Sequence, residues 1–185
     1  MSVLGMLEVS SIAVGIRAAD AMVKAAPVAL LDSRPITPGK YMTLVTGELA
    51  AVEASVRAGV LTAGAERVVE HFVIANLHDQ VLQLLRGGKA TTDIEAVGII
   101  ETGSAAKIVE AADAACKATP IRLIMLHLAN HIGGKGYSVF TGLVADVEAS
   151  VEAGALAAGA DLLERVVIPN VYPEMHEYVL RRHAW

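Results

Sequence analysis

The chain has 185 residues, of which 54% are hydrophobic and only 4% aromatic, and its mean hydropathy is +0.51. A formal net charge of −5 argues against nucleic-acid binding, which needs a basic surface stripe. Every apolar run meets a charged residue before it reaches the roughly 20 residues of a membrane helix, so no membrane span is expected. The abundant Ala, Val, Leu and Ile exceed what two small domains bury, which predicts an obligate oligomer.

The N-terminal residues 1–5 lack the basic segment and the long apolar segment of a secretory signal, so we expect the protein to stay in the cytoplasm. The single cysteine, Cys116, falls in a helical pattern. It is interpreted as a small buried hydrophobic residue, and no chemistry is assigned to it.

In chain order, the first half is predicted to form strand, helix, strand, strand, helix, strand and a short helix, at residues 5–9, 12–26, 28–33, 41–46, 48–63, 68–75 and 79–85. Ser10 and Ser11 are candidate caps of the first helix, Pro27 ends it, and Gly64 ends the second. A turn at 35–39 makes the two central strands a hairpin. A polar, glycine-containing linker follows at 86–92.

The pattern then restarts. Gly98-Ile99-Ile100-Glu101 repeats Gly5-Met6-Leu7-Glu8 at an offset of 93 residues, and 145–160 matches 50–65 at twelve of sixteen positions at an offset of 95. Two extra residues therefore fall in or beside a second loop, between Pro120 and Gly134. Because each copy has enough strands and helices for its own core, the sequence predicts two α+β domains, at 1–90 and 91–185.

No motif for catalysis or metal binding stands out. His127 and His131 are four residues apart, but they fall on a predicted strand and its loop, where this spacing does not bring two ligands together. Gly133-Gly134-Lys135 lacks the rest of a phosphate-binding loop. If several copies close into a ring, the turn at 36–40 and its counterpart at 131–135 would line an axial hole.

Several repeated motifs resemble those of one family. They are the two Gly-x-x-Glu strands, the two Ala-Ala-Asp-Ala-x-x-Lys helices, the two loops and the segments around Asn76 and Asn170. Over nearly the whole chain the sequence resembles tandem-domain shell proteins of bacterial microcompartments in unpermuted order, and within them the propanediol-utilisation type. The resemblance implies two ferredoxin-like domains and a homotrimer that mimics a hexamer. It also implies a structural, non-enzymatic role in a cytoplasmic shell, beside hexameric and pentameric shell proteins.

The resemblance also implies roles for particular residues. Small polar metabolites would cross a central pore lined by Ile36, Thr37, Pro38, Gly39, His131, Ile132, Gly133 and Gly134. Contacts with neighbouring tiles would be made by Lys24, Lys117, Asn76 and Asn170. No catalytic residue and no metal ligand is implied in this chain.

Two departures from the family pattern matter. The propanediol type has cysteine in the first loop, where three copies would hold an iron-sulfur cluster, whereas this chain has Thr37. A hydroxyl is a weak ligand for such a cluster, so we predict no cofactor. Asn76 and Asn170 stand where many shell domains carry an arginine, which predicts weaker contacts at the tile edge.

Three alternatives remain at this point. The chain could be a trimeric ferredoxin-like regulatory protein that binds a small molecule between subunits. It could also be a shell tile that carries electrons through a centre in its pore. The third alternative is an enzyme of a type that the sequence does not reveal.

Overall fold

The computed structural model describes residues 2–88 and 93–180, so part of the linker at 86–92 lies outside the described residues. The chain forms two compact units, Met1–Leu77 and His78–Trp185. The first unit contains β1 (Ser2–Val9), α1 (Ile12–Ala25), β2 (Ala29–Ile36), β3 (Lys40–Thr46), α2 (Leu49–Ala63) and β4 (Val68–Leu77). The second contains α3 (Asp79–Leu85), β5 (Ala96–Thr102), α4 (Ala105–Ala118), β6 (Arg122–Leu128), β7 (Gly136–Gly142), α5 (Val144–Ala158), a 3-10 turn η1 (Gly159–Asp161), β8 (Leu162–Ile168) and α6 (Pro173–Leu180).

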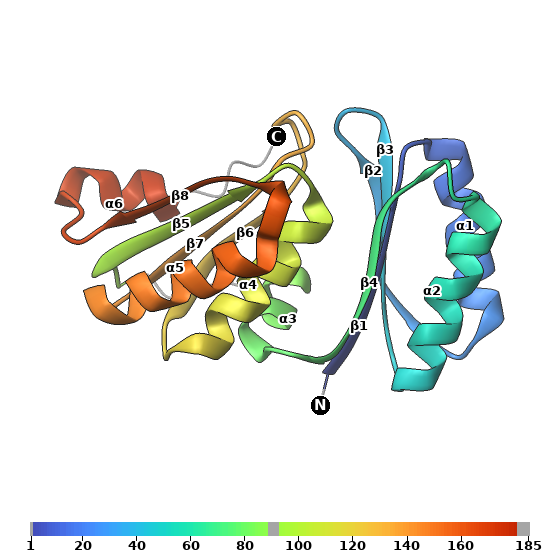
Figure 1. Cartoon of the computed structure of the whole chain (residues 1–185), viewed down its shortest axis with the longest axis horizontal. Helices are drawn as coiled ribbons and strands as arrows, with labels where there is room; N and C mark the ends of the chain where they lie inside the picture. The colour runs from blue at the N-terminus through green and yellow to red at the C-terminus, as the bar shows by residue number, and fades with distance from the viewer. Residues whose placement is uncertain (1, 89–92, 181–185) are drawn as a thin grey trace. The chain divides into compact units, whose positions relative to one another are not determined.

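Each unit is a four-stranded antiparallel sheet with two helices on one face (Figure 1). The strand order is β2-β3-β1-β4 in the first unit and β6-β7-β5-β8 in the second, and the pairings are equivalent. Helices α1 and α2 cover the first sheet, while α4 and α5 cover the second. The predicted α+β repeat is confirmed. Among the described helices, none is long and apolar enough to cross a membrane.

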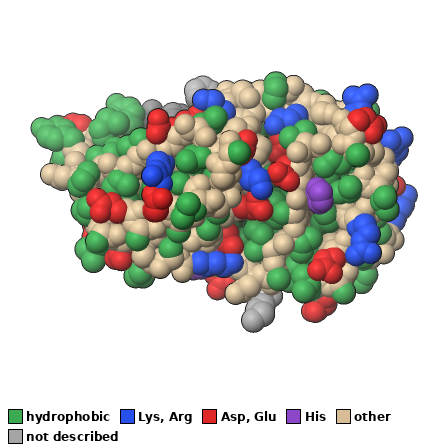
Figure 2. Space-filling view, viewed as in Figure 1, with side chains coloured by type: hydrophobic (Ala, Val, Ile, Leu, Met, Phe, Trp, Pro, Cys, Tyr) green, Lys and Arg blue, Asp and Glu red, His purple; other side chains and the backbone are tan. Residues whose placement is uncertain are grey.

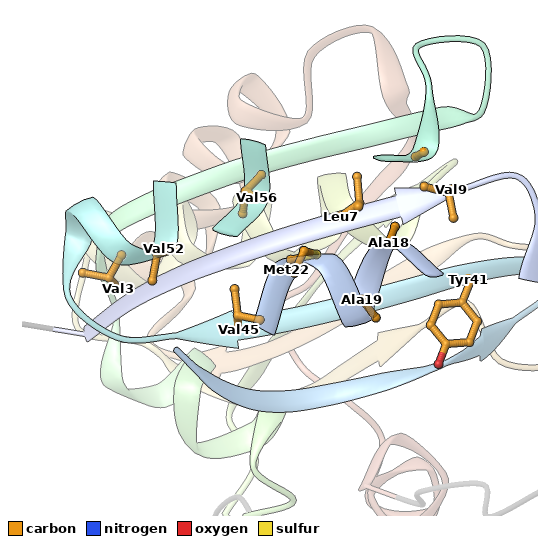
Figure 3. Packing of buried hydrophobic residues seen from close by; sticks show 11 residues of the cluster. Val3, Leu7, Val9, Ala18, Ala19, Met22, Tyr41, Val45, Val52 and Val56 are labelled. Carbon is orange, nitrogen blue, oxygen red and sulfur yellow. The ribbon is translucent and has the colours of Figure 1, made fainter. Parts of the chain in front are cut away.

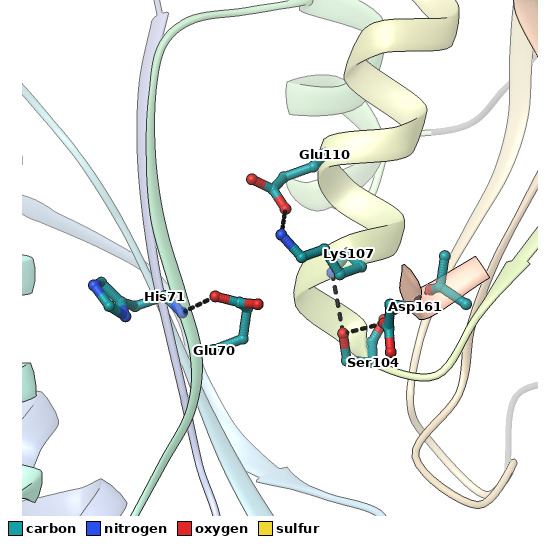
Figure 4. A network of polar contacts seen from close by, with 7 residues as sticks. Glu70, His71, Ser104, Lys107, Glu110 and Asp161 are labelled. Carbon is teal, nitrogen blue, oxygen red and sulfur yellow. Dashed lines mark hydrogen bonds and ion pairs between the residues drawn. The ribbon is translucent and has the colours of Figure 1, made fainter. Parts of the chain in front are cut away.

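The helices begin and end where local chemistry satisfies their free backbone groups. Ser11 caps α1 by accepting a hydrogen bond from the N–H of Val14 at 3.4 Å, as one of the two predicted caps. Ser104 caps α4 in the same way, accepting from Lys107 N at 3.3 Å, and its hydroxyl donates to Asp161 at 2.7 Å (Figure 4). Gly64 ends α2 at a φ of +82°, a backbone angle that favours glycine.

The core of the first unit lies between the helices and alternate residues of the central strand β1. Leu7 and Val9 point into this core beside Met22 of α1 and Val56 of α2 (Figure 3). The glycine of the repeated strand motif allows this close packing. A Cβ atom at Gly5 would stand 2.6 Å from Val52 Cγ1, and one at Gly98 would meet the equivalent valines of α5 at 2.5 and 2.7 Å.

Strand pairing locates the two extra residues of the second repeat. Ile36 pairs with Lys40 across the first hairpin, which leaves three loop residues, 37–39. In the second hairpin Ala129 N–H donates to Lys135 O, which leaves five, 130–134. The insertion therefore lies in the loop itself, and the flanking strands keep their register.

The division between the units differs from the position that the sequence repeat suggests. The repeat places α3 at the end of the first copy, with the boundary at 90/91, whereas α3 packs against β6 and α4 and belongs to the second unit. The reason is the helix's partners: the side chain of Gln80 hydrogen-bonds to the backbone at Ile121 and Leu123.

Candidate functional site: two hairpin loops

The first loop is a tight turn between β2 and β3. Gly39 N–H donates to Ile36 O at 3.0 Å, and Gly39 has a φ of +94°, which explains glycine at this position. Ile36 is buried and anchors the turn, while Thr37 is half-buried and Pro38 and Gly39 are exposed; the Thr37-Pro38 peptide is cis. The loop therefore offers solvent one hydroxyl, one proline ring and bare backbone.

The second loop is wider and has more unusual backbone angles. His131, Gly133 and Gly134 all have positive φ, at +57°, +69° and +89°. His131 and Gly133 are exposed, Ile132 is half-buried and Gly134 is buried. A non-glycine residue at positive φ is uncommon, and His131 adopts this conformation inside the loop that the hydrogen bond from Ala129 N–H to Lys135 O closes. Its surface is an imidazole and backbone amides.

An ion pair between a loop lysine and a strand glutamate holds each loop. Lys40 pairs with Glu8 of β1, whose side chain is fully buried, and Lys135 pairs with Glu101 of β5 at 2.7 Å. The second pair is far more exposed, with half of the Lys135 side chain in solvent. Each glutamate is the last residue of the repeated Gly-x-x-Glu motif.

Glu8 and Glu101 were not predicted as site residues. The signal was present in the sequence, because a glutamate ends each repeated strand motif and a lysine ends each loop. Sequence reasoning did not connect the two motifs, since their pairing depends on β1 lying beside β3 and β5 beside β7.

His127, one of the two histidines that lie four residues apart, has partners of its own. His127 stacks on Tyr137 with ring centroids 5.2 Å apart, and its Nε2 lies 2.8 Å from Asn130 O. Partial burial raises the pKa of Tyr137. Among residues 2–88 and 93–180, no group of three or more His, Cys, Asp or Glu side chains is placed to hold a metal ion.

Cys116 is nearly fully buried in α4, and it is the chain's only cysteine. Burial, with a smaller contribution from the nearby Asp113 carboxylate, raises the pKa of its thiol to about 12. The thiol is therefore protonated and inaccessible at neutral pH, and it is a poor metal ligand or nucleophile.

The four candidate edge residues lie on separate elements. Lys24 is in the last turn of α1, mostly exposed and paired with Asp20 at 2.6 Å, and Lys117 pairs with Asp113 in α4. Asn76 is exposed in β4, and Asn170 is exposed just after β8. The two lysines hold equivalent places in the two units, and so do the two asparagines.

Each unit also carries a shallow groove away from its loop. One of about 580 Å³ lies between α2 and β4, and a smaller one of about 260 Å³ lies at the equivalent place between α5 and β8. Both lie within a single unit. The small-molecule alternative places its ligand between subunits, so these grooves do not support it.

Comparison with known proteins gives a consistent result. A family profile described as the BMC domain matches residues 3–77 and 96–171. The bacterial microcompartment shell protein PduT of Citrobacter freundii is 40% identical over 179 residues, which cover 97% of this chain and 96% of that protein. The carboxysome shell protein CsoS1C of Hydrogenovibrio crunogenus is 44% identical over 95 residues, 49% of this chain and 90% of that one.

Solved structures agree with the sequence comparisons. A microcompartment protein from Desulfitobacterium hafniense DCB has a TM-score of 0.86 and 45% identity, and the match covers 95% of this chain and 98% of that one. A fused permuted hexameric shell protein from the RMM microcompartment has a TM-score of 0.65 over 85% of this chain and 83% of its own. At 20% identity, the second likeness concerns the fold alone.

Proposed function

Because this chain belongs to the BMC-domain family of bacterial microcompartment shell proteins and carries that domain twice, we propose that three copies close into one pseudohexagonal tile. Its structural role in a shell, and with it a place in the bacterial cytoplasm, follow from the family. The observation that supports the trimer is the equivalence of the two units, with the same strand order and a Glu–Lys pair holding each loop. Three chains supply the six equivalent domains of a closed ring.

The proposed tile is tested by the mass of the particle in solution and by its assembly into sheets. We expect a particle of about three 19.3 kDa chains by analytical ultracentrifugation, and hexagonally packed sheets in electron micrographs when the protein is mixed with a hexameric shell protein. A chain that stays monomeric at every concentration and forms no sheets would rule out this function.

The two loops would meet around the axis of this ring and line a pore for small polar metabolites. Residues 36–39 and 131–134 present backbone amides, one threonine hydroxyl and one imidazole, a lining that selects by diameter and hydrogen bonding. In a Thr37→Cys variant, a three-armed maleimide should join three chains through position 37. A Leu61→Cys variant, changed on the exposed side of α2, is the control and should give no such product. Equal yields from the two variants would count against an axial first loop.

The residues present do not fit an iron-sulfur cluster. The first loop offers only the Thr37 hydroxyl, and the chain's only thiol, Cys116, is buried in α4 and protonated. We therefore propose a pore without a cofactor and without electron transfer. Anaerobic reconstitution with iron and sulfide should give no stoichiometric cluster absorbance in the wild-type protein. A spectrum of one cluster per three chains would favour the electron-carrying alternative.

At the edges of the tile, Lys24 and Lys117 would contact neighbouring hexameric or pentameric shell proteins, with Asn76 and Asn170 close to the same boundaries. The observation in favour is their equivalent placement in the two units, which gives each edge of a pseudohexagon the same lysine. Replacing both lysines by alanine should abolish mixed sheets and leave the trimer mass unchanged. We propose no enzymatic activity, since the family is structural.

A further inference from the structure

The helix that follows the first repeat docks on the second. The backbone N–H of His78, just before α3, donates to Asp113 of α4 at 2.8 Å. The Gln80 side chain donates to Ile121 O at 2.9 Å and accepts from Leu123 N at 2.8 Å. Val81 is fully buried. Helix α3 thus covers a face made by α4 and β6, and it does so with both polar and apolar contacts.

Helix α6 is the counterpart of α3 after the second repeat, because Ile168–Val171 aligns with Ile74–Leu77. It also begins with the same turn: Met175 N–H donates to Tyr172 O at 2.8 Å, as Val81 N–H does to His78 O at 3.0 Å. Its outer side is nevertheless left uncovered by residues 2–88 and 93–180. Met175 is 50% exposed and Tyr172 is 70% exposed, and hydrophobic side chains gather over this helix in Figure 2.

The inner side of α6 holds the helix to its own unit. His176 Nε2 lies 3.2 Å from Val171 O, and Val179 packs against the second unit's core cluster. The helix is therefore fixed at one side, while its Met175 and the preceding Tyr172 are exposed.

The face that corresponds to the covered one lies on the first unit, on α1 and β2. Its backbone follows the same plan, because the bulge between Leu123 and Met125 recurs between Leu30 and Asp32. Its side chains differ sharply in exposure. Leu123 is 3% exposed and Cys116 5%, whereas their counterparts Leu30 and Val23 are 50% and 40% exposed.

The polar part of this face is repeated as well. Asp113 is buried and receives the N–H of His78, while its counterpart Asp20 is exposed with its side chain bonded to Lys24. The first unit thus carries a copy of the docking face, with an acceptor and an apolar patch in the same places, and no part of the described chain covers it.

We infer that α6 of one copy docks on α1 and β2 of a second copy in the way that α3 docks on α4 and β6. In this contact the Tyr172 N–H donates to the Asp20 carboxylate of the second copy. The Glu174 side chain accepts from the Leu30 N–H. Met175 takes the place that Val81 has in the docked α3. The inference rests on the proposed ring and names the contact that closes it. Each chain already contains α3 docked within it. It also carries α6 near one end and the face on α1 and β2 near the other, so copies join head to tail.

The strength of the contact can be changed at one position, Glu174. Gln80 both donates and accepts, but Glu174 stands in its place, and a carboxylate cannot donate to the carbonyl of Val28, the counterpart of Ile121. A Glu174→Gln variant restores the missing hydrogen bond. It should lower the dissociation constant between copies about fivefold, the effect of one neutral hydrogen bond.

The deciding experiment is a photo-cross-link between copies. Two differently tagged full-length chains are co-expressed, with benzoylphenylalanine at position 175 in one of them, and cross-linked pairs are captured through the other tag. We expect the cross-linked peptide to come from α1 or β2 of the second chain. The same photoreactive residue at position 61, an even more exposed place on α2, should not label that segment. Cross-links to other segments, within one chain only, or equally from position 61 would overturn the inference.

A thermodynamic test uses variants on both sides of the contact. Leu30→Asp and Met175→Asp should each raise the dissociation constant at least tenfold, while Leu156→Asp, at a 73% exposed position on α5, should leave it unchanged. Circular dichroism checks that every variant folds. Trimers that are insensitive to both substitutions would overturn this contact and leave the proposed tile standing. A wild-type chain that never associates would overturn both.

Discussion

At the scale of single residues, the two Glu–Lys pairs show how one motif serves two environments. The pair in the first unit is buried, and the pair in the second is largely exposed. Breaking a buried ion pair leaves an uncompensated charge in a poor solvent, whereas an exposed pair contributes little to stability. The same sequence motif is therefore expected to contribute differently to the free energy of unfolding in the two repeats.

The first prediction follows from this difference. Lys40→Met leaves Glu8 buried without its lysine, so we expect the free energy of unfolding to fall by about 3 kcal/mol. The equivalent Lys135→Met should cost less than about 1 kcal/mol. Urea unfolding followed by circular dichroism measures both. Equal losses would show that burial does not decide the strength of these pairs.

A second prediction concerns pH. The pKa of the Cys116 thiol is raised from 9.0 to about 12. Between these pH values the folded protein keeps the thiol proton, while the unfolded chain loses it. The contribution to stability is therefore fully present below pH 9 and declines as the pH rises toward 12, by up to about 1.4 kcal/mol per pH unit.

The measurement compares the wild-type protein with Cys116→Ala, because lysines and tyrosines titrate in the same range. The difference between their free energies of unfolding should be constant from pH 7 to 8.5 and should shrink from pH 9 to 10.5. A difference that does not change over this range would contradict the raised pKa. In the folded wild-type protein, the thiol should also react with iodoacetamide far more slowly than a free cysteine.

At the scale of elements, the strands, the helices and their order could be predicted from periodicity, caps and the internal repeat. Gly5 and Gly98 could be recognised as a repeated motif, but not as the places where α2 and α5 pack closely on the sheet, because that depends on partners distant in sequence. The same holds for α3. Its sequence identifies a short helix, whereas only the fold shows that Gln80 binds the backbone of the following repeat.

This attachment gives a third prediction. Gln80→Ala leaves the Ile121 carbonyl and the Leu123 N–H without their partner at a part-buried site, and should cost about 2 kcal/mol. Gln83→Ala changes an exposed residue of the same helix and should stay within about 0.5 kcal/mol. Hydrogen exchange at Leu123 gives a local readout, since its N–H should lose protection in the first variant and keep it in the second.

At the scale of the whole molecule, composition predicted an oligomer, and large apolar side chains remain exposed on both units. They include Ile16, Leu30, Leu61, Leu143 and Leu156. Sequence alone could place the candidate pore residues on two loops, but it could not say what holds the loops or which faces are exposed for a contact between copies. Both answers depend on side chains that meet only after each sheet has formed.

If association accounts for this exposed surface, stability must depend on concentration. We expect the thermal unfolding midpoint to rise by several degrees over a 100-fold increase in protein concentration, because binding between folded copies stabilises the folded state. Differential scanning calorimetry on freshly dialysed samples measures it. A midpoint that is independent of concentration, together with monomeric mass, would mean that the exposed apolar residues are not buried by copies of this chain.

The unequal lengths of the two hairpin loops, three residues against five, have a genetic consequence. In a hexamer built from single domains, a codon change in the loop is copied to all six positions around the axis. In a trimer of this duplicated chain, each codon is copied only three times. In the proposed trimer, a new side chain in one loop would therefore appear at three positions around the axis, while the other loop would keep its lining at the remaining three.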